Sequence, residues 1–124
     1  MNKKHPRDQK AVSEFSSRAD FKLPNGYLEF LSTSNGAEGQ LEGSYLILWP
    51  IEELFSLNEG YYVDEFAPGF FIIGSDGSGT AFAFDKLTGE FYEMPFIGMS
   101  REEAVFRAKD FAGLINSLDE GTAN

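Results

Sequence analysis

Apolar side chains near the start of the chain recur every three or four residues, which predicts two helices. The first spans about Gln9 to Ala19. Its repeating apolar positions are Ala11, Val12, Phe15 and Ala19. The second begins at Pro24, because proline lacks a backbone N–H and the first turn of a helix does not use that group. It ends at Asn35-Gly36, since both residues tolerate the left-handed conformation. The glycine-rich segment Gly36 to Gly43 then predicts a loop.

The segment Tyr45 to Trp49 is apolar at every position, which predicts a strand covered on both faces. Pro50 ends that strand. A short helix is expected from Ile51 to Gly60, with carboxylates in the first turn, where the helix dipole favours them.

Three further strands are expected at Phe70 to Ile73, Thr80 to Phe84 and Glu90 to Met94. The turns between them are Asp76 to Gly79 and Lys86 to Gly89. Alternation within the middle strand places its phenylalanines on one face and its alanines on the other. The three strands are therefore expected to form an antiparallel sheet whose small-residue face accepts a helix.

Ser100 and Glu103 have the spacing of a capping box, which predicts a last helix that begins after Ser100 and ends at Gly121. Its expected apolar face is Ala104, Ala108, Phe111, Leu114, Ile115 and Leu118. Helices at both ends with strands between them predict a single α+β domain over residues 9–124, in which a largely antiparallel sheet is flanked by helices. Residues 1–8 form a basic leader that is expected to be flexible.

The 124 residues include no Cys and one His, His5, which lies in the leader. This composition excludes disulfides, thiolate metal sites and thiol nucleophiles. The longest apolar runs are far shorter than the roughly 20 residues of a membrane-spanning helix. We therefore expect a cytoplasmic protein without catalytic residues, metal or other cofactor.

Charge is strongly segregated along the chain, whose formal net charge is −10. Residues 23–85 contain no Lys or Arg but ten carboxylates. These are Glu29, Glu38, Glu42, Glu52, Glu53, Glu59, Asp64, Glu65, Asp76 and Asp85. Such a field repels nucleic acids and anionic membranes and attracts a basic protein. An acidic surface that serves only solubility explains the same pattern equally well.

Two motifs suggest ligand sites but lack the necessary residues. Gly74 and Gly79 have phosphate-loop spacing, yet the following Thr80-Ala81 replaces the required Lys and Ser or Thr. Asp76, Ser78 and Thr80 alternate like calcium ligands, without the terminal Glu of an EF-hand. A hairpin turn explains this segment better than either site. The neighbouring carboxylates Glu52-Glu53 and Asp64-Glu65 are more typical of solvated surfaces than of an acid–base pair.

Aromatic residues next to carboxylates are the strongest indication of a binding surface. Tyr61 and Tyr62 precede Asp64 and Glu65, and exposed aromatics of this kind are common in protein interfaces. Packing in the core is an equally good explanation. Trp49, at the end of an apolar strand, is expected to pack in the core or at its rim.

Several fragments, in this order and spacing, resemble the SUKH superfamily, the group around the fungal Smi/Knr cell-wall regulators and many bacterial immunity proteins. The matching residues are Leu23-Pro24 with Tyr27, Phe30 and Leu31, then Asn35-Gly36, Leu48-Trp49-Pro50 with Leu54, and Ile73 to Thr80 leading to Phe84-Asp85. The resemblance implies an α+β domain without catalytic residues, in which Gly74, Asp76, Gly77 and Gly79 determine shape.

By this resemblance, we expect an immunity protein that neutralises a basic toxin, such as a nuclease. The expected contact residues are Glu52, Glu53, Glu59, Tyr61, Tyr62, Asp64 and Glu65. A housekeeping adaptor of the Smi/Knr type is the alternative. A hydrolytic enzyme is a third possibility, for which the sequence offers no nucleophile, base or metal set.

Overall fold

The structure, a computed structural model, describes residues 2–3, 9–42 and 44–119. In this part of the chain the helices are α1 (Gln9–Arg18), α2 (Asn25–Thr33), α3 (Leu54–Gly60), α4 (Val63–Phe66) and α5 (Phe111–Asp119). Two 3₁₀ turns are η1 (Ile51–Glu53) and η2 (Arg101–Glu103). The strands are β1 (Asn2–Lys3), β2 (Ala37–Gln40), β3 (Tyr45–Leu48), β4 (Phe70–Ser75), β5 (Thr80–Asp85), β6 (Phe91–Pro95) and β7 (Val105–Ala108).

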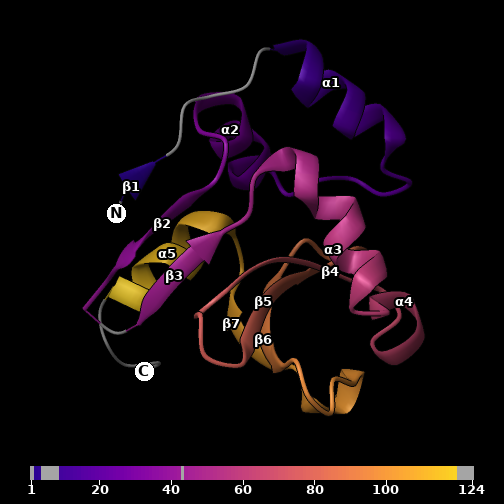
Figure 1. The fold of residues 1–124 in the computed structure, drawn as a ribbon, viewed down its shortest axis with the longest axis vertical. Helices are drawn as coiled ribbons and strands as arrows, with labels where there is room; N and C mark the ends of the chain where they lie inside the picture. The colour runs from indigo at the N-terminus through magenta and orange to yellow at the C-terminus, as the bar shows by residue number, and fades with distance from the viewer. Residues whose placement is uncertain (1, 4–8, 43, 120–124) are drawn as a thin grey trace.

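The strands form a single antiparallel sheet in the order β1-β2-β3-β4-β5-β6-β7, so that each strand lies beside its neighbours in the sequence (Figure 1). This arrangement confirms the predicted α+β class with an antiparallel sheet and flanking helices. The three predicted central strands are β4, β5 and β6.

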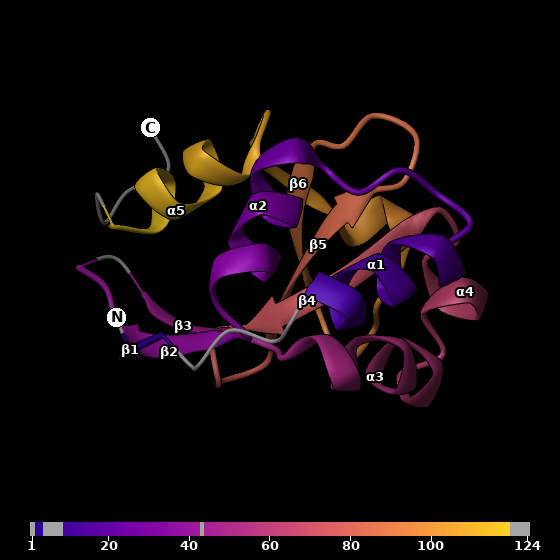
Figure 2. The same ribbon diagram turned by 90° about the horizontal axis from the view of Figure 1, so that it is seen from above.

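Each face of the sheet has its own apolar cluster. On the first face, α1, α2, α5 and the start of α3 pack against the sheet, and Figure 2 shows α1, α2 and α5 along one side of it. Phe82 and Phe84 of β5 point into this cluster. Ala81 and Ala83 point into the second cluster, beside Val63 of α4. The predicted alternation of large and small side chains is therefore confirmed, and α4 is the helix that packs on the small-residue face.

The prediction of a loop at residues 36–43 is wrong, because Ala37–Gln40 forms strand β2. Its backbone pairs with β3, from Ala37 opposite Leu48 to Gln40 opposite Tyr45. Ala37 is buried, while Gln40 is exposed. Pairing with a neighbouring strand therefore overrides the low strand propensity of the glycine and polar residues.

Strand β3 is not covered on both faces as its apolar run predicted. Leu46 and Leu48 are buried, whereas Tyr45 and Ile47 are half-exposed. The Tyr45 hydroxyl donates a hydrogen bond to Glu38 Oε2 on β2 at 2.6 Å. The outward face thus carries amphipathic and apolar side chains where polar residues would be usual.

The single helix expected after Ser100 is also wrong. The Ser100 hydroxyl accepts the Glu103 N–H at 3.2 Å, as the capping box predicts, but the turn that follows is the three-residue η2. The chain then extends into β7, whose Val105 and Phe106 have high strand propensity and pair with β6. The final helix starts after Asp110.

Three expectations fall partly or wholly on residues outside the described ranges. Of the leader, residues 1–8, the structure describes the two residues of β1, which pair with β2. His5 and the expected helix exit at Gly121 lie outside the described residues.

Tyr27 of α2 carries a phenol hydroxyl that has no hydrogen-bond partner in the described part of the chain. The side chain is fully buried, and its ring contacts those of Phe30, Phe84 and Phe111. Burial in this apolar environment raises the pKa of Tyr27, because the ionised phenolate would lose its hydration.

We expect Tyr27→Phe to stabilise the domain by about 1 kcal/mol at neutral pH, because it removes a buried, unsatisfied hydroxyl. The raised pKa of Tyr27 also makes the difference in stability between the two proteins depend on pH. Above pH of about 10 the unfolded chain binds fewer protons than the folded one, so the wild type loses a further ~1.4 kcal/mol per pH unit relative to the variant. Urea unfolding of both proteins at pH 7 and pH 11 measures this. A variant less stable at both pH values would show that the hydroxyl is satisfied.

Candidate functional site

The predicted contact residues lie on η1, on the two short helices α3 and α4 that follow it, and on the turn between these helices. We call the exposed residues there the α3–α4 surface: Glu53, Glu59, Tyr61, Tyr62, Asp64, Glu65 and Phe66. Tyr61, Tyr62 and Phe66 expose 41%, 62% and 51% of their area, respectively. The buried side chains of Leu54 and Val63 anchor the two helices to the domain.

An aromatic group, made up of the side chains of Trp49, Tyr61 and Phe96, joins this surface to two distant parts of the chain. The Tyr61 ring stacks on Trp49, at the end of β3, with centroids 6.4 Å apart and planes 7° apart. Phe96, which follows β6, lies 4.6 Å from the Tyr61 centroid. Trp49 and Phe96 are half-buried against the second apolar cluster. Trp49 thus lies at the rim of the core, and Tyr61 extends the cluster outward to solvent.

Tyr62 has a backbone conformation that is unusual for a side chain of its size. It is the residue before α4, and its φ of 56° and ψ of 43° lie in the left-handed region. Holding a non-glycine residue there costs about 1 kcal/mol or more. The ring meets Phe66 edge-on at 6.4 Å and is otherwise open to solvent. This exposed and strained aromatic residue is an unusual choice for a turn that serves packing alone.

Two of the predicted acidic contact residues already have partners within the chain. Asn35 Nδ2 donates to both oxygens of Glu52, at 2.9 and 3.3 Å, and Asn35 Oδ1 accepts the Ile51 N–H at 2.8 Å. Glu52 therefore helps to fix the start of the α3 segment. Asp64 Oδ1 lies 3.4 Å from Lys86 Nζ. Because the Asp64 side chain is 89% exposed, this ion pair is weak.

Three other carboxylates of the α3–α4 surface are available to a partner. Glu53, Glu59 and Glu65 are exposed, and none of them forms an ion pair with a Lys or Arg in the described ranges. Glu59 and Glu52 line a groove of ≈ 360 Å³ between α1 and α3. Glu53 and Trp49 line a second hollow, of ≈ 410 Å³, beside β2 and β3. Acidic side chains therefore border both ends of α3.

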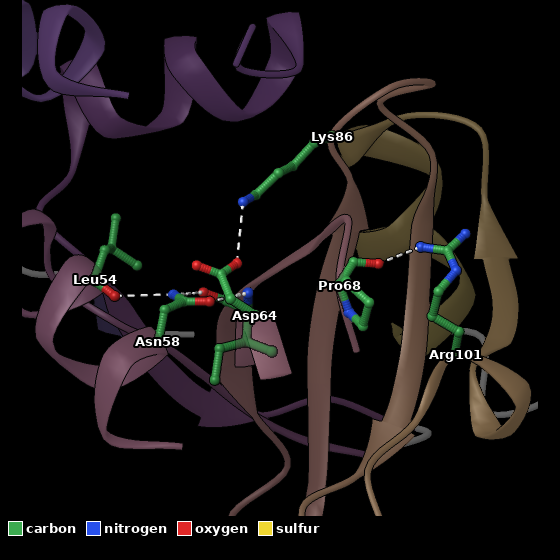
Figure 3. A network of polar contacts seen from close by, with 7 residues as sticks. Leu54, Asn58, Asp64, Pro68, Lys86 and Arg101 are labelled. Carbon is green, nitrogen blue, oxygen red and sulfur yellow. Dashed lines mark hydrogen bonds and ion pairs between the residues drawn. The ribbon is translucent and has the colours of Figure 1, made fainter. Parts of the chain in front are cut away.

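The amide of Asn58 attaches α3 to the sheet (Figure 3). Asn58 Oδ1 accepts the Ile72 N–H at 2.8 Å, and Asn58 Nδ2 donates to the Ile72 carbonyl at 2.9 Å. The same Nδ2 donates to the Leu54 carbonyl at 2.8 Å. The Asn58 side chain thus forms the two hydrogen bonds with Ile72 of β4 that a neighbouring strand would form, close to where β3 ends. These bonds fix the position of α3.

Arg101 holds the segment that leads from α4 into β4. Its Nη1 donates to the Pro68 carbonyl at 2.6 Å, as Figure 3 shows. Its guanidinium carbon lies 4.7 Å from the centroid of the Phe70 ring, and Nη2 lies 3.9 Å from Asp85 Oδ2. A cation from the last third of the chain thus fixes the far end of the α3–α4 segment.

The glycine-rich segment joins β4 to β5 as a turn. Asp76 Oδ1 accepts the N–H groups of Ser78, Gly79 and Thr80 at 2.8, 3.2 and 3.1 Å. Gly77 has a φ of 78°, which favours glycine. The donors that a phosphate loop would direct at an anion are therefore satisfied by Asp76 itself.

Gly74 and Pro50 have roles in the backbone around β3. A Cβ at Gly74 would collide with the Ile47 carbonyl oxygen, so that glycine permits the close approach of β3 and β4. Pro50, in extended conformation, precedes η1 and directs the chain out of the sheet toward α3.

The predicted contact residues did not include Phe66, Phe96 or Asn58. Phe66 was detectable, since it follows Asp64 and Glu65 directly. Phe96 and Asn58 were not, because their partners lie 35 and 14 residues away along the chain. Among the described residues, no group of three or more His, Cys, Asp or Glu side chains is placed to hold a metal ion. No helix in the same ranges has the length and apolar character needed to cross a membrane.

Comparison with models of known protein families identifies a match. The model of the SMI1 / KNR4 family (SUKH-1) matches residues 6–117. No curated protein matches the chain. The matched region contains the α3–α4 surface, the aromatic group and the turn at Asp76, and it confirms the resemblance inferred from the sequence. Because this match covers most of the 124 residues, the chain belongs to the SMI1 / KNR4 family (SUKH-1).

Proposed function

We propose that this chain is a cytoplasmic immunity protein that binds a basic toxin domain, such as a nuclease, through its α3–α4 surface. Membership of the family is consistent with a protein-binding domain of the immunity or regulatory type. The observation that carries the proposal is the exposure of Tyr61, Tyr62 and Phe66 on a surface with three carboxylates that form no ion pair in the described ranges, namely Glu53, Glu59 and Glu65.

The chemistry of this surface suits a cationic protein. Large, rigid aromatic side chains supply much of the binding energy in protein interfaces. Carboxylates around them steer a positively charged partner and can raise its association rate by roughly 10- to 1,000-fold. A nuclease needs a cationic cleft for its substrate, so an acidic inhibitor that covers the cleft blocks catalysis without reacting chemically.

The backbone of the α3–α4 surface supports the same function. Asn58 and Arg101 fix the two ends of the segment, so that the aromatic side chains are held in place before a partner arrives. Preorganisation of this kind lowers the entropy cost of association. The left-handed backbone of Tyr62 is a local cost that exposure to a partner would explain.

A growth-rescue experiment tests this function. A tagged form of the chain is recovered from its native host at low salt, and the basic protein that co-purifies is then expressed alone and together with it. An immunity protein restores growth when that partner is toxic. A partner that is harmless alone favours the second candidate, a housekeeping adaptor of the Smi/Knr type. Recovery of acidic partners only would contradict the charge argument.

A further inference from the structure

Three lysines line one hollow of ≈ 360 Å³, although the chain has only ten Lys and Arg in all. Lys22 precedes α2, Lys86 lies in the turn between β5 and β6, and Lys109 lies between β7 and α5. The remaining lining residues are Leu23, Pro24, Gly26, Leu87, Thr88, Gly89 and Asp110. The fold therefore brings together cations from both ends of a chain whose middle contains none.

Two of these lysines form no ion pair in the described ranges. Lys22 and Lys109 are exposed and form no ion pair there, although the chain has 20 carboxylates. Lys86 contributes less charge, because its Nζ lies 3.4 Å from Asp64 Oδ1 and 4.9 Å from the centroid of the Phe21 ring, and both of these residues line a different hollow. Positive charge thus remains uncompensated at this hollow.

The backbone adds to this positive charge. The nine-residue helix α2 starts at the hollow, and Pro24 before it provides no side-chain hydrogen bond to its first N–H groups. A Cβ at Gly26 would lie 3.1 Å from Phe111 Cβ, so the positive ends of α2 and α5 lie side by side. Among the described lining residues, Asp110 is the one carboxylate. Its Oδ1 accepts the Gly113 N–H at 2.8 Å, so it compensates the positive end of α5, and the positive end of α2 remains uncompensated.

We propose that this hollow binds a phosphate group, either as free phosphate or as the monoester of a small molecule. Lysine ammonium groups bind phosphate as point charges, and a dianion gains more from several of them than a monovalent ion does. The volume is within the range of small-molecule sites. The overall charge of −10 opposes a long polyanion, which restricts the ligand to a small one.

Titration of the full chain with inorganic phosphate, ribose 5-phosphate and sodium chloride at matched ionic strength tests this site. Backbone amide shifts of Gly26 and Gly89 report on it by NMR. We expect saturable shifts with phosphate compounds, at dissociation constants on the order of 1 mM or tighter, and small linear shifts with chloride. Tighter binding of ribose 5-phosphate identifies a monoester ligand, and equal binding identifies free phosphate. Linear shifts with all three would overturn the proposal.

Variants with matched charge changes separate a local site from general electrostatics. Lys22→Gln and Lys109→Gln should each weaken phosphate binding by about tenfold or more, because each removes a charge-assisted contact. Arg18→Gln makes the same charge change at an exposed residue outside this hollow and should alter binding less than about twofold. Equal weakening by all three variants would show that the hollow is not a site.

Discussion

Gly74→Ala should destabilise the domain by about 4 kcal/mol, a large part of the 5–15 kcal/mol typical of a folded domain. The added Cβ would collide with the Ile47 carbonyl oxygen, which belongs to the backbone of β3 and cannot rotate away. Relief requires β3 to move away from β4, where the two strands pair through Leu48 and Gly74. Urea unfolding monitored by circular dichroism measures the change.

Gly60→Ala is the matched control. Gly60 is the last residue of α3, its φ is not positive, and a Cβ there would meet no atom within 4 Å. We expect this variant to be unchanged or more stable by up to about 1 kcal/mol, because alanine favours helix. A Gly74→Ala variant within about 1 kcal/mol of wild type would show that β3 and β4 have room for a Cβ between Gly74 and the Ile47 carbonyl.

Asn58→Ala is the second substitution with a large expected effect, about 3 kcal/mol. It leaves the N–H and carbonyl of Ile72, a fully buried residue, without the partners that the amide supplies. It also frees α3 from the sheet, so partner affinity should fall together with stability. Chemical unfolding measures the stability change.

Two further variants show whether the amide itself is required. Asn58→Asp keeps an acceptor for the Ile72 N–H but places a carboxylate oxygen near the carbonyls of Ile72 and Leu54, so it should also destabilise. Asn116→Ala removes an exposed asparagine of α5 and should change stability by no more than about 0.5 kcal/mol. If Asn58→Ala changes stability no more than Asn116→Ala does, the Asn58 side chain does not take the place of a neighbouring strand beside β4.

Elements with strong local signals were predicted well from the sequence. The apolar spacing around Phe15 and the proline at position 24 locate α1 and α2 to within a few residues. Alternation in Thr80 to Phe84 assigned the two phenylalanines and the two alanines of β5 to the correct faces. These signals depend on neighbours within a turn or a strand, so the sequence alone contains them.

Elements that depend on distant partners were missed. Strand β2 contains glycine and polar residues, and it is extended because β3 lies beside it. Val105 and Phe106 lie within the segment that the spacing of Ala104, Ala108 and Phe111 assigned to a helix, but pairing with β6 makes them a strand. In β2 the tertiary contact outweighs a local preference of a few tenths of a kcal/mol per residue. In β7 the pairing acts together with the strand propensity of Val105 and Phe106.

The candidate site was predicted in part. The proximity of Tyr61, Tyr62 and their acidic neighbours follows from their positions in the sequence. The stacking of Tyr61 on Trp49 does not, because the two residues approach through the return of the chain along α3. The hydrogen bonds between Asn35 and Glu52 show that one predicted contact carboxylate has a structural role.

The central claim is that negative charge on the α3–α4 surface recruits a basic partner. Its most direct test is the association rate constant of the partner recovered from the host, measured across a range of salt concentrations. The test variant is Glu53→Lys/Glu59→Lys/Glu65→Lys. The control is Glu29→Lys/Glu42→Lys/Glu102→Lys, which makes the same change in net charge at exposed carboxylates elsewhere.

We expect the test variant to slow association by about tenfold or more at low salt and to flatten the salt dependence. The control should stay within about threefold of wild type, because distant charges are screened. Unfolding curves establish that both variants are folded. Equal slowing by the two variants, or no slowing by either, would contradict recruitment through the α3–α4 surface.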